Sequence, residues 1–213
     1  MKFKMVFFDC DGVILKDPIP FKRLHRAGGI SEDQDREWKD AYYSGKISFK
    51  KWMENIQQTY IKNGMSYSLF KETLAYHEIN PQIYPLLKYL KKNKIKTAII
   101  SSGIDEYVNP VAKELGIDLC QTNYTFSFDR KGKLQKINYL SSDQESKVIQ
   151  IKEICRQFGI KPTETLFVGD SINDLKAFKL TKHGILYKRG YNDRRYKKYA
   201  WKTIKNLEEI KNF

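Results

Sequence analysis

Two acidic residues, Asp9 and Asp11, stand two positions apart directly after a short apolar run at residues 3–8. If the chain stays extended there, both carboxylates project to the same side while Cys10 points away. One carboxylate can then attack a phosphorus atom, while the other donates a proton to the leaving oxygen and later takes one from water. The pair predicts a catalytic carboxylate site, although an Asp-x-Asp pair alone is more often a solvated turn.

A second apolar run ends in hydroxyl groups and a glycine. Residues 99–103 read IISSG, which places Ser101, Ser102 and Gly103 just before a stretch with helical character. The Ser101 hydroxyl and neighbouring backbone N–H groups at such a position can cradle a phosphate. Serine and glycine at this position are also common in helix caps, so this pattern alone is weak evidence for a phosphate site.

A third feature combines two further carboxylates with a lysine. Asp170 ends an apolar run in the sequence VGDSIND, and Asp174 follows one helical turn later. Carboxylate oxygens with room left for water are what Mg²⁺ prefers. Lys147 lies 23 residues before Asp170 and can offer a positive charge to a transferring phosphoryl group. Together with the first two features, these residues supply every part that a metal-assisted phosphoryl transfer needs.

The elements that must position these residues are short strands alternating with helices. Apolar runs typical of buried strands occupy residues 3–8, 95–101, 165–168 and 184–187, and the last three each follow a stretch with helical periodicity. This alternation predicts an α/β fold with a Rossmann-like parallel sheet. Ligands bind such sheets beyond the C-terminal ends of the strands, where the polar features stand.

Several helix starts can be read from the sequence. Pro81 opens a stretch with apolar residues on one face. The pairs Ser142–Glu145 and Asn206–Glu209 have the spacing of capping boxes, so each predicts the first turn of a helix.

The segment from about residue 16 to 80 breaks the strand–helix rhythm. It contains helix-like stretches separated by glycine-containing pairs and no convincing strand, whereas residues 124–137 alternate around Lys131-Gly132 like a β-hairpin. We therefore expect an α/β core formed by residues 1–15 and 81–213, with a small helical cap, residues 16–80, inserted after the first strand.

Composition limits the class of protein. The 213 residues are 41% hydrophobic with 26 Phe and Tyr, enough for a core despite a net charge of +14. The three cysteines lack metal-type spacing and do not indicate a disulfide framework or a zinc knuckle. The N-terminal apolar run is too short for a signal peptide, and no run approaches the ~20 residues of a membrane span. We expect a soluble, cytoplasmic protein that does not associate with membranes.

Half of the net charge lies between residues 188 and 205. Eight basic residues and one acidic residue alternate there with Tyr191, Tyr196, Tyr199 and Trp201, a mixture that suits nucleic acid. The structural interpretation is a surface helix over 191–198 followed by a last strand over 200–204. A nucleic-acid-binding protein, or a phosphatase of nucleic-acid ends, therefore stays open as the alternative function.

The polar features together resemble the haloacid dehalogenase superfamily of aspartate-nucleophile phosphatases, in its phosphoserine phosphatase-like branch. The first motif of that family, D-x-D-G-[TV], is matched by residues 9–13, and the fourth, G-D-x-x-x-D, by residues 169–174. Asn173 also stands as in this branch. The second-motif hydroxyl is matched by Ser101 and the third-motif lysine by Lys147, so the resemblance spans nearly the whole chain.

The resemblance implies a mechanism and a set of roles. Asp9 would form an aspartyl-phosphate, and Asp11 would act as general acid and base. The phosphate would be held by Ser101, Ser102, Gly103 and Lys147, with Asn173 nearby. The cofactor Mg²⁺ would bind through Asp9, the backbone carbonyl of Asp11, and Asp170, with Asp174 supporting through water or by orienting Lys147. The helical insert corresponds to the family's type 1 cap, which suits small phosphorylated metabolites.

The substrate is less specified. Phosphoserine phosphatases read the amino acid with a Glu soon after the first motif and an Arg in the cap, whereas ungapped counting places Pro18 and Ile56 there. This departure argues against phosphoserine. The charged residues available instead are Asp17, Lys16, Arg23, His25, Arg26 and Lys46. We expect a Mg²⁺-dependent phosphomonoester hydrolase whose oligomeric state the sequence does not indicate.

Overall fold

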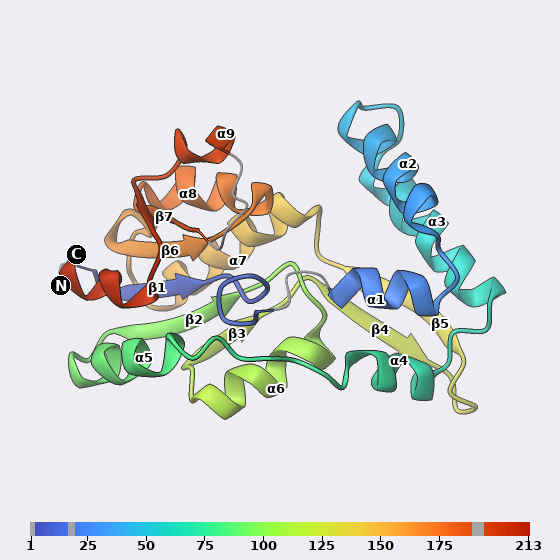
Figure 1. Ribbon diagram of the computed structural model, residues 1–213, viewed down its shortest axis with the longest axis horizontal. Coiled ribbons are helices and arrows are strands. Elements are labelled where there is room, and N and C mark those ends of the chain that lie inside the picture. Colours follow the sequence, from blue (N-terminus) through green and yellow to red (C-terminus); the bar gives the residue numbers. More distant parts are fainter. Residues whose placement is uncertain (1–2, 17–19, 189–193) are drawn as a thin grey trace. The chain divides into compact units, whose positions relative to one another are not determined.

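A computed structural model describes residues 3–16, 20–188 and 194–213 (Figure 1). The chain divides into two compact units. Unit 1 comprises Met1–Pro18, Glu78–Asn123 and Leu140–Phe213, and unit 2 comprises Ile19–His77 and Tyr124–Tyr139.

Unit 1 is built on a six-stranded sheet in which every neighbouring pair is parallel, in the order β3-β2-β1-β6-β7-β8. The strands are β1 (Met5–Phe8), β2 (Lys96–Ile100), β3 (Leu119–Gln121), β6 (Thr165–Gly169), β7 (Gly184–Tyr187) and β8 (Lys202–Ile204). The expected α/β class with a Rossmann-like parallel sheet is confirmed.

Strand β1 lies at the centre of this sheet, between β2 and β6. Phe8 pairs in register with Ile99 on one side and Val168 on the other, so the C-terminal ends of the three strands meet at one edge. All four β1 residues are buried because the sheet is covered on both faces. This explains why residues 3–8 read as a continuous apolar run rather than an alternating one.

The two faces of the sheet are covered by different helices, with α5 (Ile83–Lys92) and α6 (Asp105–Leu115) on one side and α7 (Asp143–Gln157) and α8 (Leu175–Thr181) on the other (Figure 1). Met5 and Phe7 share one core cluster with Ile151 and Ile154 of α7 and Phe178 of α8. The remaining elements are α9 (Arg194–Lys197) and three short 3₁₀ helices, η1 (Pro162–Glu164), η2 (Ile172–Asp174) and η3 (Leu207–Asn212).

One of the two predicted capping boxes forms. The Asn206 side chain accepts from Glu208 N, and Glu209 completes the box at the start of η3, which is a 3₁₀ helix. Ser142 does precede α7, but its side chain makes no capping hydrogen bond. Its expected partner Glu145 forms an ion pair with Lys176 instead, so the box predicted there is absent.

Unit 2 contains four helices and a hairpin: α1 (Pro20–Ala27), α2 (Glu32–Tyr43), α3 (Phe49–Lys62), α4 (Tyr67–Leu74), β4 (Tyr124–Phe128) and β5 (Leu134–Tyr139). The serines Ser31, Ser48 and Ser66 precede α2, α3 and α4, and each accepts a hydrogen bond from the amide three residues later. These side chains satisfy amides that have no partner within the helix.

The hairpin belongs to unit 2, which differs from the expected division into residues 1–15 with 81–213 and 16–80. Leu134 N donates to Met65 O at 3.1 Å, and Ile137 N donates to the Gln57 side chain at 2.8 Å. The rings of Phe70 and Phe126 lie 4.7 Å apart. Sequence distance hid this grouping, because the helices that bury the hairpin's apolar residues precede it by fifty positions or more.

The described parts of the basic segment 188–205, residue 188 and residues 194–205, belong to unit 1. Residues 189–193 lie outside the described residues, and within the described part the predicted helix is the short α9 and the predicted last strand is β8. Tyr196 packs against the core cluster, and the Trp201 ring contacts Phe3 and Phe213. The packing of Tyr196 favours the structural interpretation of the segment, whereas Tyr199 and Trp201 are 51% and 42% exposed. Among the helices of the described residues, none is long and apolar enough to cross a bilayer.

Candidate active site

Asp9 follows β1 directly, at the centre of the sheet edge. Its backbone N–H continues the sheet by donating to Val168 O at 2.8 Å, and its side chain is almost fully buried. Oδ1 accepts from Cys10 N at 2.8 Å, while Oδ2 lies 2.8 Å from Lys147 Nζ. A buried carboxylate fixed at both oxygens by donors is held in a single orientation.

The chain turns immediately after Asp9, so the extended path through Asp11, the condition under which both carboxylates were predicted to share one side, is not met. The Cys10 carbonyl accepts from the amides of Ile14 and Leu15, both at 2.9 Å, and closes a tight loop. Gly12 has a φ of +80°, and a Cβ on it would lie 2.1 Å from Asp170 Oδ2. Only glycine allows this backbone shape and this close approach.

The turn brings Asp11 next to the second motif. A Cβ built on Gly103 would lie 3.5 Å from Asp11 Oδ2 and 2.9 Å from Ser101 Oγ. Ser101, fully buried after β2, accepts from Gly103 N at 2.8 Å. Ser102 Oγ donates to Asp143 O at 3.2 Å, so its hydroxyl is directed toward the start of α7. The structure therefore gathers Asp11, Ser101 and Gly103, and it directs the Ser102 hydroxyl toward α7.

Lys147 lies in the first turns of α7 and is almost completely buried. Its Nζ is 2.6 Å from Asp174 Oδ1 in addition to its contact with Asp9. Burial alone would lower the pKa of Lys147, but the carboxylates of Asp174 and Asp9 outweigh it and hold that pKa above its ordinary value. Lys147 is therefore a permanent cation shared by two carboxylates.

Asp174 is an orienting residue in this arrangement. Besides binding Lys147, it accepts at Oδ2 from the amides of Asp170 and Ser171, at 3.0 and 2.9 Å. Gly169 makes room for it, since a Cβ there would lie 2.3 Å from Asp174 Cγ. Both oxygens thus already accept hydrogen bonds, and of the two roles expected for Asp174, these contacts favour the orientation of Lys147.

The site has the donor set of a metal centre. Asp9, Asp170 and Asp174 each offer an oxygen, and these three atoms lie within 4.8 Å of one another. Burial, then the neighbouring carboxylates of Asp174 and Asp9, raise the pKa of Asp170 to about 8, and burial raises that of Asp9 despite Lys147. A divalent cation relieves this crowding of negative charge, and carboxylate oxygen is the ligand of hard cations such as Mg²⁺. The residues therefore fit a metal ion.

Asn173 lies in η2, and its side chain points toward α7. Its Nδ2 lies 3.5 Å from Asp143 Oδ2, and Asp143 Oδ1 lies 3.4 Å from Asn123 Nδ2. The buried Asn123 also accepts from the amides of Leu140 and Ser141. Asn123 and Asp143 position the start of α7, and with it Lys147. Sequence reasoning missed both, because neither belongs to a motif and only their side-chain contacts reveal them.

The charged residues proposed for substrate recognition are partly accounted for by structural contacts. Asp17 and Pro18 lie outside the described residues. Ile56 is buried in α3, Arg23 donates to Tyr76 O at 2.9 Å, and Lys16 pairs with Glu78. His25 is buried within unit 2. The position expected to hold a recognition arginine is therefore a core position.

Comparison with known proteins places the chain in a family. The model of a hydrolase family, the haloacid dehalogenase-like hydrolases, matches residues 3–180. Curated phosphoserine phosphatases are similar in sequence. Those of Saccharomyces cerevisiae and Methanocaldococcus jannaschii are 24% identical over 186 residues and 26% over 187, covering 86% and 84% of this chain. The chain spans 59% of the length of the first and 82% of the second.

Solved structures agree with this comparison at the level of the fold. A phospho-aspartyl intermediate analogue of phosphoserine phosphatase superposes with a TM-score of 0.77 at 21% identity, covering 100% of this chain and 99% of that one. A substrate-bound phosphoserine phosphatase gives 0.75 at 21%, covering 100% and 98%. With most of its length matched by the family model, the chain belongs to the haloacid dehalogenase-like hydrolases.

Proposed function

We propose that this protein is a Mg²⁺-dependent phosphomonoester hydrolase of small phosphorylated metabolites that works through an aspartyl-phosphate on Asp9. The observation that carries this proposal is the buried Asp9–Lys147–Asp174 arrangement at the end of the central strand. It presents a carboxylate oriented by a permanent cation, beside the hydroxyl and amide of the second motif. Family membership and the phosphoserine phosphatase relatives support the same reaction class.

The residues divide the reaction into two displacements. In the first, an Asp9 oxygen attacks the phosphorus of a monoester held by Lys147 and by the Ser101 hydroxyl, which the Gly103 N–H orients, and the P–O bond to the leaving alcohol breaks. Asp11 donates a proton to the leaving oxygen. In the second, Asp11 takes a proton from water, which attacks the phosphorus and returns Asp9 as a carboxylate with release of inorganic phosphate.

A cation at this site would be held by Asp9, Asp170 and the backbone carbonyl of Asp11. When bound, the cation would neutralise negative charge on the phosphoryl oxygens. Asp174 keeps Lys147 in place throughout. We also propose a cytoplasmic location, which the three free cysteines support because a reducing compartment keeps thiols unpaired.

The proposed substrate class, small phosphate monoesters, is broader than phosphoserine. The relatives named above are phosphoserine phosphatases, but this chain places a buried isoleucine, Ile56, where ungapped counting expects the recognition arginine. We therefore propose a small phosphate monoester whose leaving group is read by other residues.

The test replaces the nucleophile. Asp9→Asn is expected to lower turnover of p-nitrophenyl phosphate in Mg²⁺ by roughly 10³-fold or more, the scale of losing a catalytic nucleophile. Glu153→Gln, the same chemical change at an exposed position of α7, serves as the matched control. Chelation with EDTA should stop the wild type, and Mg²⁺ should restore it. Retention of activity by a folded Asp9→Asn protein, with folding checked by circular dichroism, contradicts the assignment.

A further inference from the structure

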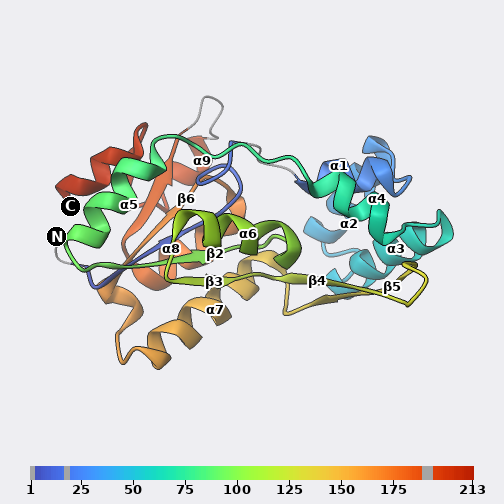
Figure 2. The ribbon, with the colours of Figure 1, turned by 90° about the horizontal axis from the view of Figure 1, so that it is seen from below.

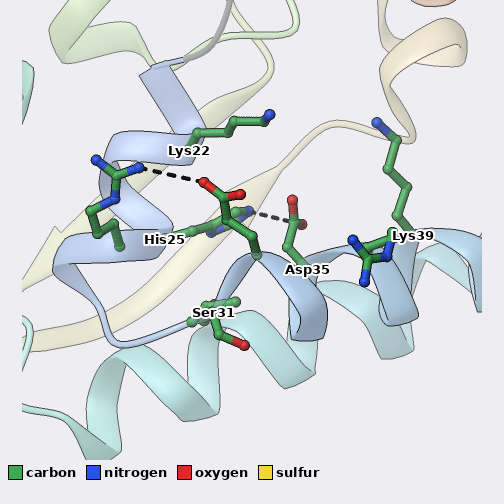
Figure 3. Close-up of a pocket in the computed structure, with 9 residues that line it drawn as sticks. Lys22, His25, Ser31, Asp35 and Lys39 are labelled. Atoms are coloured by element: carbon green, nitrogen blue, oxygen red, sulfur yellow. Dashed lines mark hydrogen bonds and ion pairs between the residues drawn. The ribbon is translucent and has the colours of Figure 1, made fainter.

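Unit 2 contains a pocket of about 370 Å³ between α1 and α2, lined mainly by basic side chains (Figure 3). The charged residues around it are Lys22, Arg26, Arg36, Lys39, Glu32 and Asp35. They lie on one face of each helix, at spacings of three and four residues that bring side chains to the same side. The two helices therefore present opposing charged walls to one space.

Positive charge exceeds negative charge in this pocket. Four cationic side chains face two carboxylates; Arg26 lies 3.4 Å from Glu32, and Arg36 pairs with Asp33, which is not among the lining residues. Lys22 and Lys39 are exposed, and neither makes an ion pair or hydrogen bond with any residue in the described ranges. Two ammonium groups, one from each wall, are thus available to a ligand.

The floor of the pocket is a buried histidine in a fixed setting. His25 is 7% exposed, with Nδ1 2.7 Å from the hydroxyl of Tyr60 and Nε2 3.4 Å from Asp35 Oδ1. Figure 3 shows His25 directed at Asp35 across the gap between the helices. A Cβ on Gly28 would lie 2.3 Å from the Tyr60 ring, so this glycine lets Tyr60 pack beneath α1. The floor is set by core packing and does not depend on mobile surface side chains.

We propose that this pocket binds a small polyanion, a molecule that carries two or more phosphate or carboxylate groups. Its volume suits a small metabolite. Lys22 and Lys39 supply point charges from opposite walls, while Arg26 and Arg36, each in an exposed ion pair with Glu32 or Asp33, carry planar forks that match phosphate and carboxylate oxygens. A molecule with one anionic group engages one wall, whereas a polyanion engages both.

Binding of the polyanion does not depend on the proposed catalytic function, because every residue that forms the pocket belongs to unit 2. A role as substrate does rest on the proposed function, because a substrate must also reach Asp9 of unit 1. Two kinds of molecule carry these anionic groups. The polyanion is either a substrate with an acidic group besides its phosphate ester, or a separate effector, and enzyme kinetics distinguish the two.

Binding is tested with tripolyphosphate and citrate as probes, without Mg²⁺ at low salt, on the full chain carrying Asp9→Asn so that nothing is turned over. The chain has three histidines, so the His25 ring protons can be assigned in proton NMR spectra through His25→Gln. Both probes are expected to shift the His25 resonance in a saturable way. The double variant Lys22→Gln/Lys39→Gln should weaken binding roughly tenfold, the product of two exposed charge contacts.

The matched control is Lys62→Gln/Lys71→Gln, which removes the same charge from exposed positions of α3 and α4 in unit 2. It should bind like the parent. An unshifted His25 resonance at millimolar probe, or equal affinity in the two double variants, overturns the proposal. These outcomes leave the Asp9 assignment untouched.

Kinetics on the chain with Asp9 intact then identify the source. If the polyanion is a substrate, Lys22→Gln/Lys39→Gln should raise KM for phosphate esters bearing a carboxylate and leave KM for p-nitrophenyl phosphate unchanged. If it is an effector, citrate should change p-nitrophenyl phosphate turnover in the wild type and not in the variant. Binding accompanied by neither effect contradicts a functional pocket.

Discussion

Replacing Lys147 with methionine tests how the active-site charges are balanced. Lys147→Met keeps the length and apolar stem of the side chain but removes its charge. The ammonium group lies 2.8 Å from Asp9 and 2.6 Å from Asp174, and all three side chains are more than nine-tenths buried. Without it, the formal charge of Lys147 with the three carboxylates changes from −2 to −3, counting Asp9, Asp170 and Asp174 as ionised.

The expected loss is large because two buried carboxylates lose their shared partner. Breaking a buried ion pair by removing one member costs about 3–5 kcal/mol. With a urea dependence of roughly 2 kcal/mol per molar, this corresponds to a midpoint lowered by roughly 2 M. Since a bound cation would mask part of the effect, unfolding is measured in EDTA.

Trp201 is the only tryptophan of unit 1, so its fluorescence in a Trp38→Phe/Trp52→Phe background follows that unit alone. The control is Lys152→Met, the same replacement at an exposed position of α7, which should change the midpoint little. The reasoning is refuted if Lys147→Met and Lys152→Met have equal midpoints.

Two further predictions concern the first loop and the buried histidine. Gly12→Ala should raise the Mg²⁺ concentration needed for half-maximal turnover, because its Cβ displaces Asp170, whereas Gly45→Ala, at a similar φ of +76° with open space around it, should cost only about 1–2 kcal/mol of stability. Equal Mg²⁺ dependence in both variants would contradict the steric argument. Burial lowers the pKa of His25 below that of an unfolded histidine, about 6.5. Because the unfolded chain then binds a proton that the folded chain does not, the free energy of unfolding should fall as pH drops below about 6.5, by at most about 1.4 kcal/mol per pH unit. His25→Gln should remove this part of the pH dependence; a wild-type curve identical to that of the variant would show that His25 titrates normally.

The sequence predicted well where the candidate site residues lie on the sheet. Asp9, Ser101 and Asp170 were expected at strand ends, and they directly follow the three adjacent strands β1, β2 and β6. The prediction succeeded because a parallel sheet brings the C-terminal ends of its strands, and the motifs that follow them, to the same edge. Strand β7 was also expected with the bounds that it has, residues 184–187.

Other features depend on contacts that no local pattern encodes. Two carboxylates four residues apart predict a shared metal site. Asp174 instead accepts hydrogen bonds from backbone amides, and it can lie there only because Gly169 has no side chain. The predicted orientation of the two carboxylates assumed an extended chain through Asp11, whereas the turn that the Cys10 carbonyl closes depends on amides further along. The pairing of His25 with Tyr60 joins positions 35 residues apart on different helices. Such contacts follow from packing and are visible only once the fold is known.

The hairpin of unit 2 has a consequence for synthesis of the chain on the ribosome. Helices α1 to α4 are complete by Leu74, but the strands that bury Phe70 begin at Tyr124. At a synthesis rate of roughly 5–20 residues per second, the apolar face of these helices stays exposed for several seconds before the hairpin is made. Strand β1 stays without its neighbour β6 for longer, since β6 starts at Thr165. Both units of the nascent protein thus expose hydrophobic surface until the second half of the chain emerges.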